Sequence, residues 1–166
     1  MHTYTQSGRS MIEMLGVLAI VGVLSAGGIT GYSMAMQSHK TNQVIEKMNM
    51  IAMQARKLYK GDYTDVDIQD LVDGGKIPDI TNPFGGNFQM GKWDTNNFWL
   101  YAGNLPAEAC TDIVQADWGK EGVFGGLIFH GESTPFAYSD KTYPLTTATA
   151  ISKCAGGDKG VYLIFK

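Results

Sequence analysis

Residues 8–32 read GRSMIEMLGVLAIVGVLSAGGITGY, and this stretch decides how the chain is organised. From Met14 to Tyr32 it contains no charged side chain. A helix of about 19 residues, rising about 1.5 Å per residue, just spans the hydrocarbon core of a bilayer. The stretch therefore predicts a membrane-spanning helix close to the N-terminus.

An acidic residue, Glu13, stands immediately before this uncharged run. A lone carboxylate in hydrocarbon is costly, so such an acid is normally paired or functional. The segment ahead of it, MHTYTQSG, contains no Lys or Arg, whereas a secretory signal begins with a basic region and ends at a small-residue cleavage site. A cleaved signal ending around Ser25-Ala26-Gly27-Gly28 is the alternative, and it would leave Glu13 without a use.

The order of glycine, four further residues, glutamate and an apolar run resembles the class III signal of type IV prepilins. The resemblance continues through MIEMLGVLAIVGVLSAGGI and the helix after it into the C-terminal domain. The short leader, the Asn82-Pro83-Phe84-Gly85-Gly86 turn and the two cysteines are most similar to type IVb pilins. This resemblance implies that a prepilin peptidase cuts after Gly8 and methylates Arg9, which stands where the family usually has phenylalanine or methionine.

The same resemblance implies a role for Glu13 in assembly and registration. A positive amine on one subunit can neutralise this carboxylate on another inside an apolar fibre core. A cut before the apolar run leaves that run on the product, first as membrane anchor and then as fibre core. The implied partners are further copies of the chain, the prepilin peptidase, a pilus assembly platform and an outer-membrane secretin. The implied location is the inner membrane of a Gram-negative bacterium, with the globular domain in the periplasm, and then the extracellular pilus.

Beyond Tyr32 the sequence becomes amphipathic. Apolar residues recur at alternating spacings of four and three and form one stripe, Val44, Met48, Ile51, Ala55 and Leu58. We therefore predict one helix from about Ser10 to Tyr59, whose second half lies on a globular domain. Because glycine weakens a helix, we expect the glycine-rich stretch 26–31 to unwind when the subunit enters the fibre; close helix packing is the alternative reading.

The remaining sequence predicts a small antiparallel sheet with short helices. We expect a helix capped at Thr64 and Asp65 and ending at Gly74-Gly75, and further helices over 106–118 and 147–154. Strands are expected over 87–90, 97–103, 123–131 and 160–166, and the apolar run VYLIF places the last strand inside the sheet. Three tryptophans beside these strands are expected in the core rather than as anchors for a partner or carbohydrate, Trp93, Trp99 and Trp118.

These expectations combine into an α+β fold of the type IV pilin kind, a long N-terminal helix packed on a small antiparallel sheet domain, shaped like a lollipop. We assign residues 1–8 to the leader and 9–60 to the long helix, with the membrane and assembly segment at about 11–32. Residues 61–166 form the globular domain.

Two cysteines, Cys110 and Cys154, lie far apart in a chain that begins with an export-type segment. This pattern favours one disulfide formed in an oxidising compartment, and two buried thiols are the alternative. A bond would close a loop of about 45 residues and contribute on the order of 4 kcal/mol in the chain-entropy model. The resemblance implies that the region between the cysteines, from Asp112 to Lys153, faces outward in the fibre.

Composition argues against several other functions. With 13 Lys and Arg against 16 Asp and Glu, and no basic run after the long helix, nucleic acid is not expected as a specific partner. The histidines are scattered, neither cysteine has metal-ligand spacing, and no catalytic motif is present. We therefore expect no metal, no cofactor and no enzymatic activity.

The pattern as a whole favours the major structural subunit of a type IVb pilus, a fibre for adhesion, aggregation or conjugation. A minor pilin, acting as tip adhesin or in DNA uptake, is one alternative. The other is a pseudopilin of type II secretion, but the major members of that group carry an acidic calcium loop near the C-terminus and typically lack the disulfide. Here the final residues, KCAGGDKGVYLIFK, contain only Asp158 as an acid.

Overall fold

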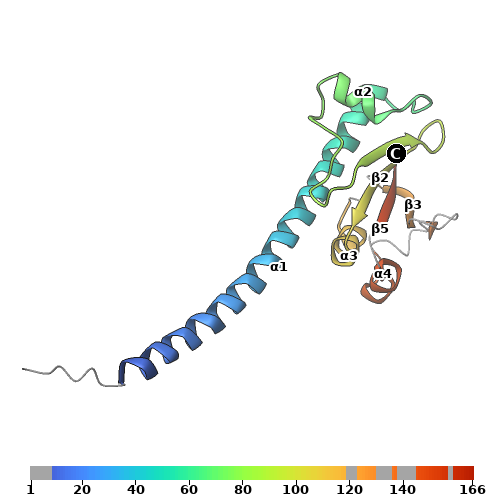
Figure 1. Ribbon diagram of the computed structural model, residues 1–166. Coiled ribbons are helices and arrows are strands. Elements are labelled where there is room, and N and C mark those ends of the chain that lie inside the picture. The colour runs from blue at the N-terminus through green and yellow to red at the C-terminus, as the bar shows by residue number, and fades with distance from the viewer. Residues whose placement is uncertain (1–8, 119–122, 130–135, 138–144, 157–158) are drawn as a thin grey trace, which may run out of the picture. The chain divides into compact units, whose positions relative to one another are not determined.

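The computed structural model describes residues 9–118, 123–129, 136–137, 145–156 and 159–166. By its internal contacts the chain divides into two units after Gln37. Helix α1, Arg9–Tyr59, begins in the first unit and ends in the second (Figure 1). The single long helix predicted from the sequence is therefore confirmed.

The second unit is built on an antiparallel sheet with the strand order β1-β2-β5-β3-β4. The strands are β1 (Phe88–Lys92), β2 (Phe98–Leu105), β3 (Val123–Phe129), β4 (Phe136–Ala137) and β5 (Lys159–Phe165). The last strand lies between β2 and β3 (Figure 1), with Leu163 opposite both Leu100 and Leu127. Its place inside the sheet, predicted from its apolar run, is confirmed, whereas β4 was not predicted.

The second part of α1 packs on this sheet through the predicted apolar stripe. Val44, Met48, Ile51 and Ala55 are fully buried, in one cluster with core residues of β1, β2 and β5. Full burial of a large apolar side chain contributes about 1.5–3 kcal/mol. The prediction for Leu58 is wrong: this side chain is 42% exposed, because the helix ends one residue later and the chain turns through positive φ at Lys60 and Gly61.

Helix α2, Ile68–Asp73, begins later than predicted. Its N-cap is Asp67, whose side chain accepts a hydrogen bond from the Gln69 N–H, rather than Thr64 or Asp65. Thr64 instead donates to the Asp62 carboxylate, and the Tyr63 N–H donates to the Thr95 carbonyl at 2.9 Å. These bonds hold the preceding residues in a turn, so the helix cannot start there.

The asparagine-centred turn at 82–86 forms as the sequence predicts. Gly85 has a φ of +82°, which favours glycine. A side chain on Gly86 would lie 2.1 Å from the Gly103 carbonyl oxygen, so only glycine fits there. This close approach places the residues that lead into β1 directly against the end of β2.

Helices α3, Ala107–Gln115, and α4, Thr147–Cys154, pack against each other. The predicted bounds of α4 are confirmed, but α3 ends three residues before Trp118 because Ala116 is already extended. Trp118 is buried and donates from Nε1 to the Ile113 carbonyl at 2.9 Å, and so satisfies a carbonyl near the helix end. Its expected place in the core is confirmed. The same expectation is wrong for Trp93, which is exposed, and Trp99 is only half-buried.

Candidate functional site: the apolar helix and the disulfide-bonded region

The first candidate site is the apolar part of α1. Every side chain from Met11 to Met36 is exposed within the single chain. In the described part of the chain, one helix, Met11–Tyr59, is long and apolar enough to cross a membrane. The most apolar stretch of 18 residues in this helix has a mean hydropathy of 2.1. Soluble monomers rarely leave so large an apolar surface to water. This surface therefore requires a bilayer or other protein chains around it.

Glu13 lies in the second turn of α1, at the start of this apolar surface. It is exposed, and it has no hydrogen bond or ion pair with any side chain that the structure describes. Gly8 and the side chain of Arg9 lie outside the described residues, so the predicted cleavage and methylation sites are not placed by the structure. A carboxylate at the start of an apolar helix is costly to bury unless a positively charged group pairs with it.

The glycines of the apolar segment face open space within one chain. A side chain added at Gly16, Gly22, Gly27, Gly28 or Gly31 would meet nothing within 4 Å. Nearby, Thr30 Oγ1 donates to the Ala26 carbonyl and Ser33 Oγ donates to the Thr30 carbonyl. The helix is continuous through residues 26–31, and its unwinding in the fibre stays a prediction.

The second candidate site is the region around the cysteines. Cys110 of α3 and Cys154 at the end of α4 form a disulfide, with their Cα atoms 5.7 Å apart and both residues fully buried. The predicted bond is therefore present, and it ties α3 to α4 across 44 positions of sequence. In the described residues no group of three or more His, Cys, Asp or Glu side chains is arranged to hold a metal ion.

A hydrogen-bonded clamp, which sequence reasoning missed, fastens the chain after α2 to α1. Lys47 Nζ donates to Asp79 Oδ1 at 2.7 Å and to the Thr81 carbonyl at 2.8 Å. The hydrogen bond from Lys47 is the largest cause that lowers the pKa of Asp79 to about 2, followed by the hydrogen bonds from Thr81. Nothing in the local pattern pairs residues so far apart, so only the fold reveals this clamp.

Asn82 makes a second set of contacts, for which the sequence did give a signal. Its amide donates to the Gly103 carbonyl at 2.8 Å, and its side-chain oxygen accepts from the N–H groups of Phe84 and Gly86. Asparagine before Pro-Phe-Gly-Gly is typical of a turn closed by its own side chain. The sequence predicted the turn, and the structure adds the bond from its first residue to β2.

No protein-family model matches the chain. Among curated proteins, the major structural subunit of the bundle-forming pilus of Escherichia coli O127:H6 is 27% identical over 173 aligned positions, covering 92% of this chain and 90% of the relative. The subunit of the same name from Escherichia coli O111:H- is 26% identical with the same coverage.

Solved structures give a consistent result. The type IVb pilin from Salmonella typhi has a TM-score of 0.53 at 17% identity, covering 72% of this chain and 95% of its own. TcpA, a type IV pilin from Vibrio cholerae El Tor, has a TM-score of 0.54 at 16% identity, covering 77% of this chain and 99% of its own. The chain therefore has the type IV pilin fold. Within that class, its predicted resemblance to type IVb pilins is confirmed.

Proposed function

We propose that the chain is the major structural subunit of a type IVb pilus, which polymerises through the apolar part of α1. The observation that carries this proposal is the apolar surface from Met11 to Met36, which is exposed within the single chain, with the carboxylate of Glu13 near its start. Both curated relatives reported above are major subunits, which supports this role over that of a minor pilin. The disulfide between α3 and α4 favours a pilin over a type II secretion pseudopilin.

The proposed processing follows the order of the residues. A prepilin peptidase cuts after Gly8 on the cytoplasmic side and methylates the new N-terminal amine of Arg9. The apolar run stays on the product and holds the subunit in the inner membrane, while the domain folds and forms its disulfide in the periplasm. An assembly platform then moves the subunit into a fibre that leaves through an outer-membrane secretin.

Glu13 has a specific part in this assembly. As an incoming subunit leaves the bilayer, its N-terminal amine neutralises the Glu13 carboxylate of a neighbouring copy in the fibre core. An unpaired carboxylate in an apolar medium costs several kcal/mol. Only the arrangement of subunits that pairs the two charges is then favourable, so the ion pair fixes their relative position along the fibre.

The mass of the fibre subunit tests the proposal. We expect fibres sheared from a pilus-assembling Gram-negative host expressing this chain to contain a subunit that starts at Arg9, carries one added methyl group and holds one disulfide. Gly8→Asp should block processing and abolish fibres, whereas the matched Ser7→Asp should not. A product that lacks residues 14–26, or a chain recovered only as a soluble monomer, would contradict the proposal.

A further inference from the structure

Lys40 is the first Asp, Glu, Lys or Arg residue after Glu13, and it follows Glu13 by 27 positions. A continuous helix of that length spans about 40 Å, whereas a bilayer is about 30 Å thick across its hydrocarbon and about 40–45 Å thick with its headgroups. If Glu13 lies at the cytoplasmic surface, as the proposed function requires, Lys40 falls at the depth of the periplasmic headgroups. Tyr32, about 28 Å from Glu13 by the same rise, falls at the edge of the hydrocarbon, where tyrosine is enriched.

Within the second unit, the fold places the turn at 82–86 beside Lys40. The Lys40 ammonium lies 5.8 Å from the centre of the Phe84 ring, and both side chains are half-buried. Two asparagines hold the turn in place. The Asn104 amide donates to the Phe84 carbonyl at 2.7 Å, and the Asn82 side-chain oxygen accepts from the Phe84 N–H at 2.8 Å. A cation and an aromatic ring are thus fixed next to each other.

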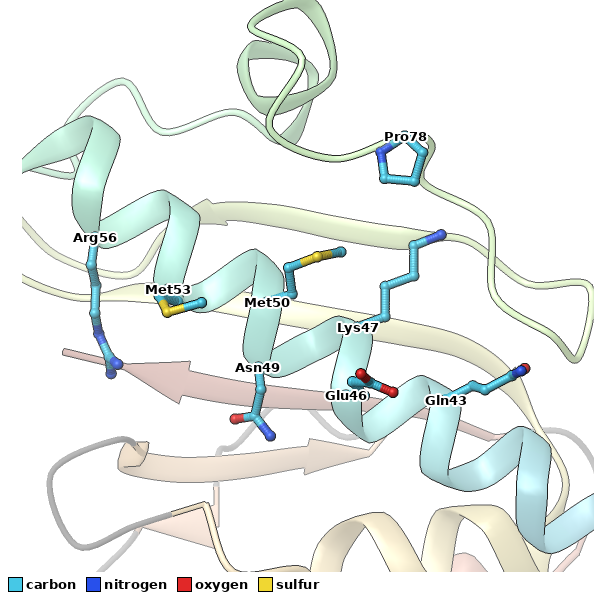
Figure 2. Close-up of a pocket in the computed structure, with 8 residues that line it drawn as sticks. All are labelled: Gln43, Glu46, Lys47, Asn49, Met50, Met53, Arg56 and Pro78. Carbon is cyan, nitrogen blue, oxygen red and sulfur yellow. The ribbon is translucent and has the colours of Figure 1, made fainter.

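Among the described residues, Lys47 is the other lysine of α1 that lies over an aromatic ring, 5.7 Å from the centre of Phe88. It lines a hollow of about 750 Å³ beside α1. Figure 2 shows Lys47 extending from α1 toward the segment that contains Pro78, where its ammonium bonds the Asp79 carboxylate. Lys40, by contrast, has no hydrogen bond or ion pair with any residue that the structure describes. Its charge is therefore not neutralised by the described part of the chain.

We propose that Lys40 and Phe84 form a membrane contact, in which the Lys40 ammonium binds the phosphate of a phospholipid headgroup in the periplasmic leaflet. A lysine near an anionic lipid surface is attracted to it, and its long stem lets the ammonium reach the phosphate. The Phe84 ring lies beside the ammonium at the boundary between headgroups and acyl chains, the depth at which lipid offers both anionic oxygen and apolar surface.

This inference rests on the proposed function, because it concerns the subunit that waits in the inner membrane before assembly. A single helix anchor leaves the domain free to turn about the helix axis. Phe84 belongs to a turn outside α1, so its contact with lipid fixes which side of the domain faces the bilayer. The waiting subunit is thereby presented in one orientation, and the contact breaks when the subunit leaves the bilayer.

Photo-crosslinking of the full chain tests the membrane contact. The photo-reactive residue p-benzoylphenylalanine replaces Phe84 in one variant and Trp93 in another, and each variant is reconstituted into vesicles of phosphatidylethanolamine and phosphatidylglycerol. Trp93 is the matched control, because it is an exposed aromatic residue in the turn between β1 and β2. That turn lies beside the end of α1, where the Thr95 carbonyl accepts from the Tyr63 N–H. We expect about tenfold or more phospholipid adduct at position 84 than at position 93, which lies outside the bilayer.

Charge variants test the part played by Lys40. With the photo-reactive residue at position 84, Lys40→Glu should lower the phospholipid adduct by about threefold or more, because attraction to the lipid phosphates becomes repulsion. Lys40→Arg keeps the charge and should retain most of the adduct. Lys57→Glu should leave the adduct unchanged, because Lys57 is an exposed lysine about 25 Å farther along the same helix. In vesicles of digalactosyldiacylglycerol, which has no phosphate, Lys40→Glu should have no effect.

A photo-reactive residue in place of Tyr32 separates this inference from the proposed function. Its lipid adduct should form in every variant, and its absence would contradict the membrane stage of the proposed function. The membrane contact alone is overturned if position 32 reacts with lipid while position 84 reacts no better than position 93. It is also overturned if Lys40→Glu leaves the adduct at position 84 unchanged. Should the replacement at 84 prevent the chain from accumulating, position 83 takes its place with the same expectations.

Discussion

At the scale of single residues, the side chain of Asn82 connects two segments of the domain. It is buried, and its side chain satisfies the Gly103 carbonyl of β2 and two N–H groups of its own turn. A buried polar group that loses its partner costs about 1–3 kcal/mol. The turn residue thus links the segment before β1 to the far end of β2.

We predict that Asn82→Ala lowers the free energy of unfolding by about 2–4 kcal/mol, because three backbone groups lose a partner at once. Urea unfolding of the detergent-solubilised subunit, followed by tryptophan fluorescence, measures the change. Asn87→Ala is the matched control, because Asn87 is exposed and its side chain has no partner among the described residues. Equal shifts in the urea midpoint for both variants would show that the Asn82 side chain is dispensable.

At the scale of elements, the sequence predicted best where the apolar pattern is strong. The long helix, α4 and the inner position of β5 follow from runs and periodicities within one segment. The start of α2 did not, because it depends on a distant partner, the Thr95 carbonyl that binds the Tyr63 N–H. The end of α3 did not either, because the backbone is already extended at Ala116. The cysteine pair could likewise be predicted from the sequence. The hollow beside α1 could not, because Pro78, which lines it, comes from another part of the chain.

The clamp between α1 and the segment after α2 makes one contribution to stability depend on pH. The pKa of Asp79 is lowered to about 2 in the folded chain, against an ordinary value of about 3.9 in an unfolded one. The unfolded state therefore takes up a proton first as the pH falls. The stabilisation is fully present above about pH 5 and is lost as the pH falls toward 2.

We predict that Asp79→Asn removes this pH dependence and costs at most about 1 kcal/mol at neutral pH, because the ion pair is partly exposed and screened by solvent. Thermal unfolding of the solubilised subunit between pH 2 and 7 measures it. The wild-type chain should lose stability faster than the variant below about pH 4. Asp65→Asn, at an exposed acid with no partner among the described residues, should follow the wild-type curve. Parallel curves for wild type and Asp79→Asn would contradict the role of the clamp.

At the scale of the whole molecule, the chain combines a domain that buries its own apolar core with an apolar helix surface that the same chain leaves exposed. The stripe from Val44 to Ala55 is buried by the sheet, while the side chains from Met11 to Met36 are all exposed. The second part of the helix therefore serves folding, while the first part needs a bilayer or other chains to cover it. Such a division suits a subunit that folds alone and is completed only by its neighbours.

In the proposed fibre the charge at Glu13 sets the register between subunits, so we predict that Glu13→Ala lowers the yield of sheared fibre by about tenfold or more. Glu13→Asp keeps the carboxylate, one methylene shorter, and should retain much of the yield. Total subunit and the mass of its N-terminus should be unchanged in both variants, because the peptidase site and the folded domain are intact. If the alanine variant assembles as well as the aspartate variant, apolar packing alone sets the register and the proposed ion pair has no part in it.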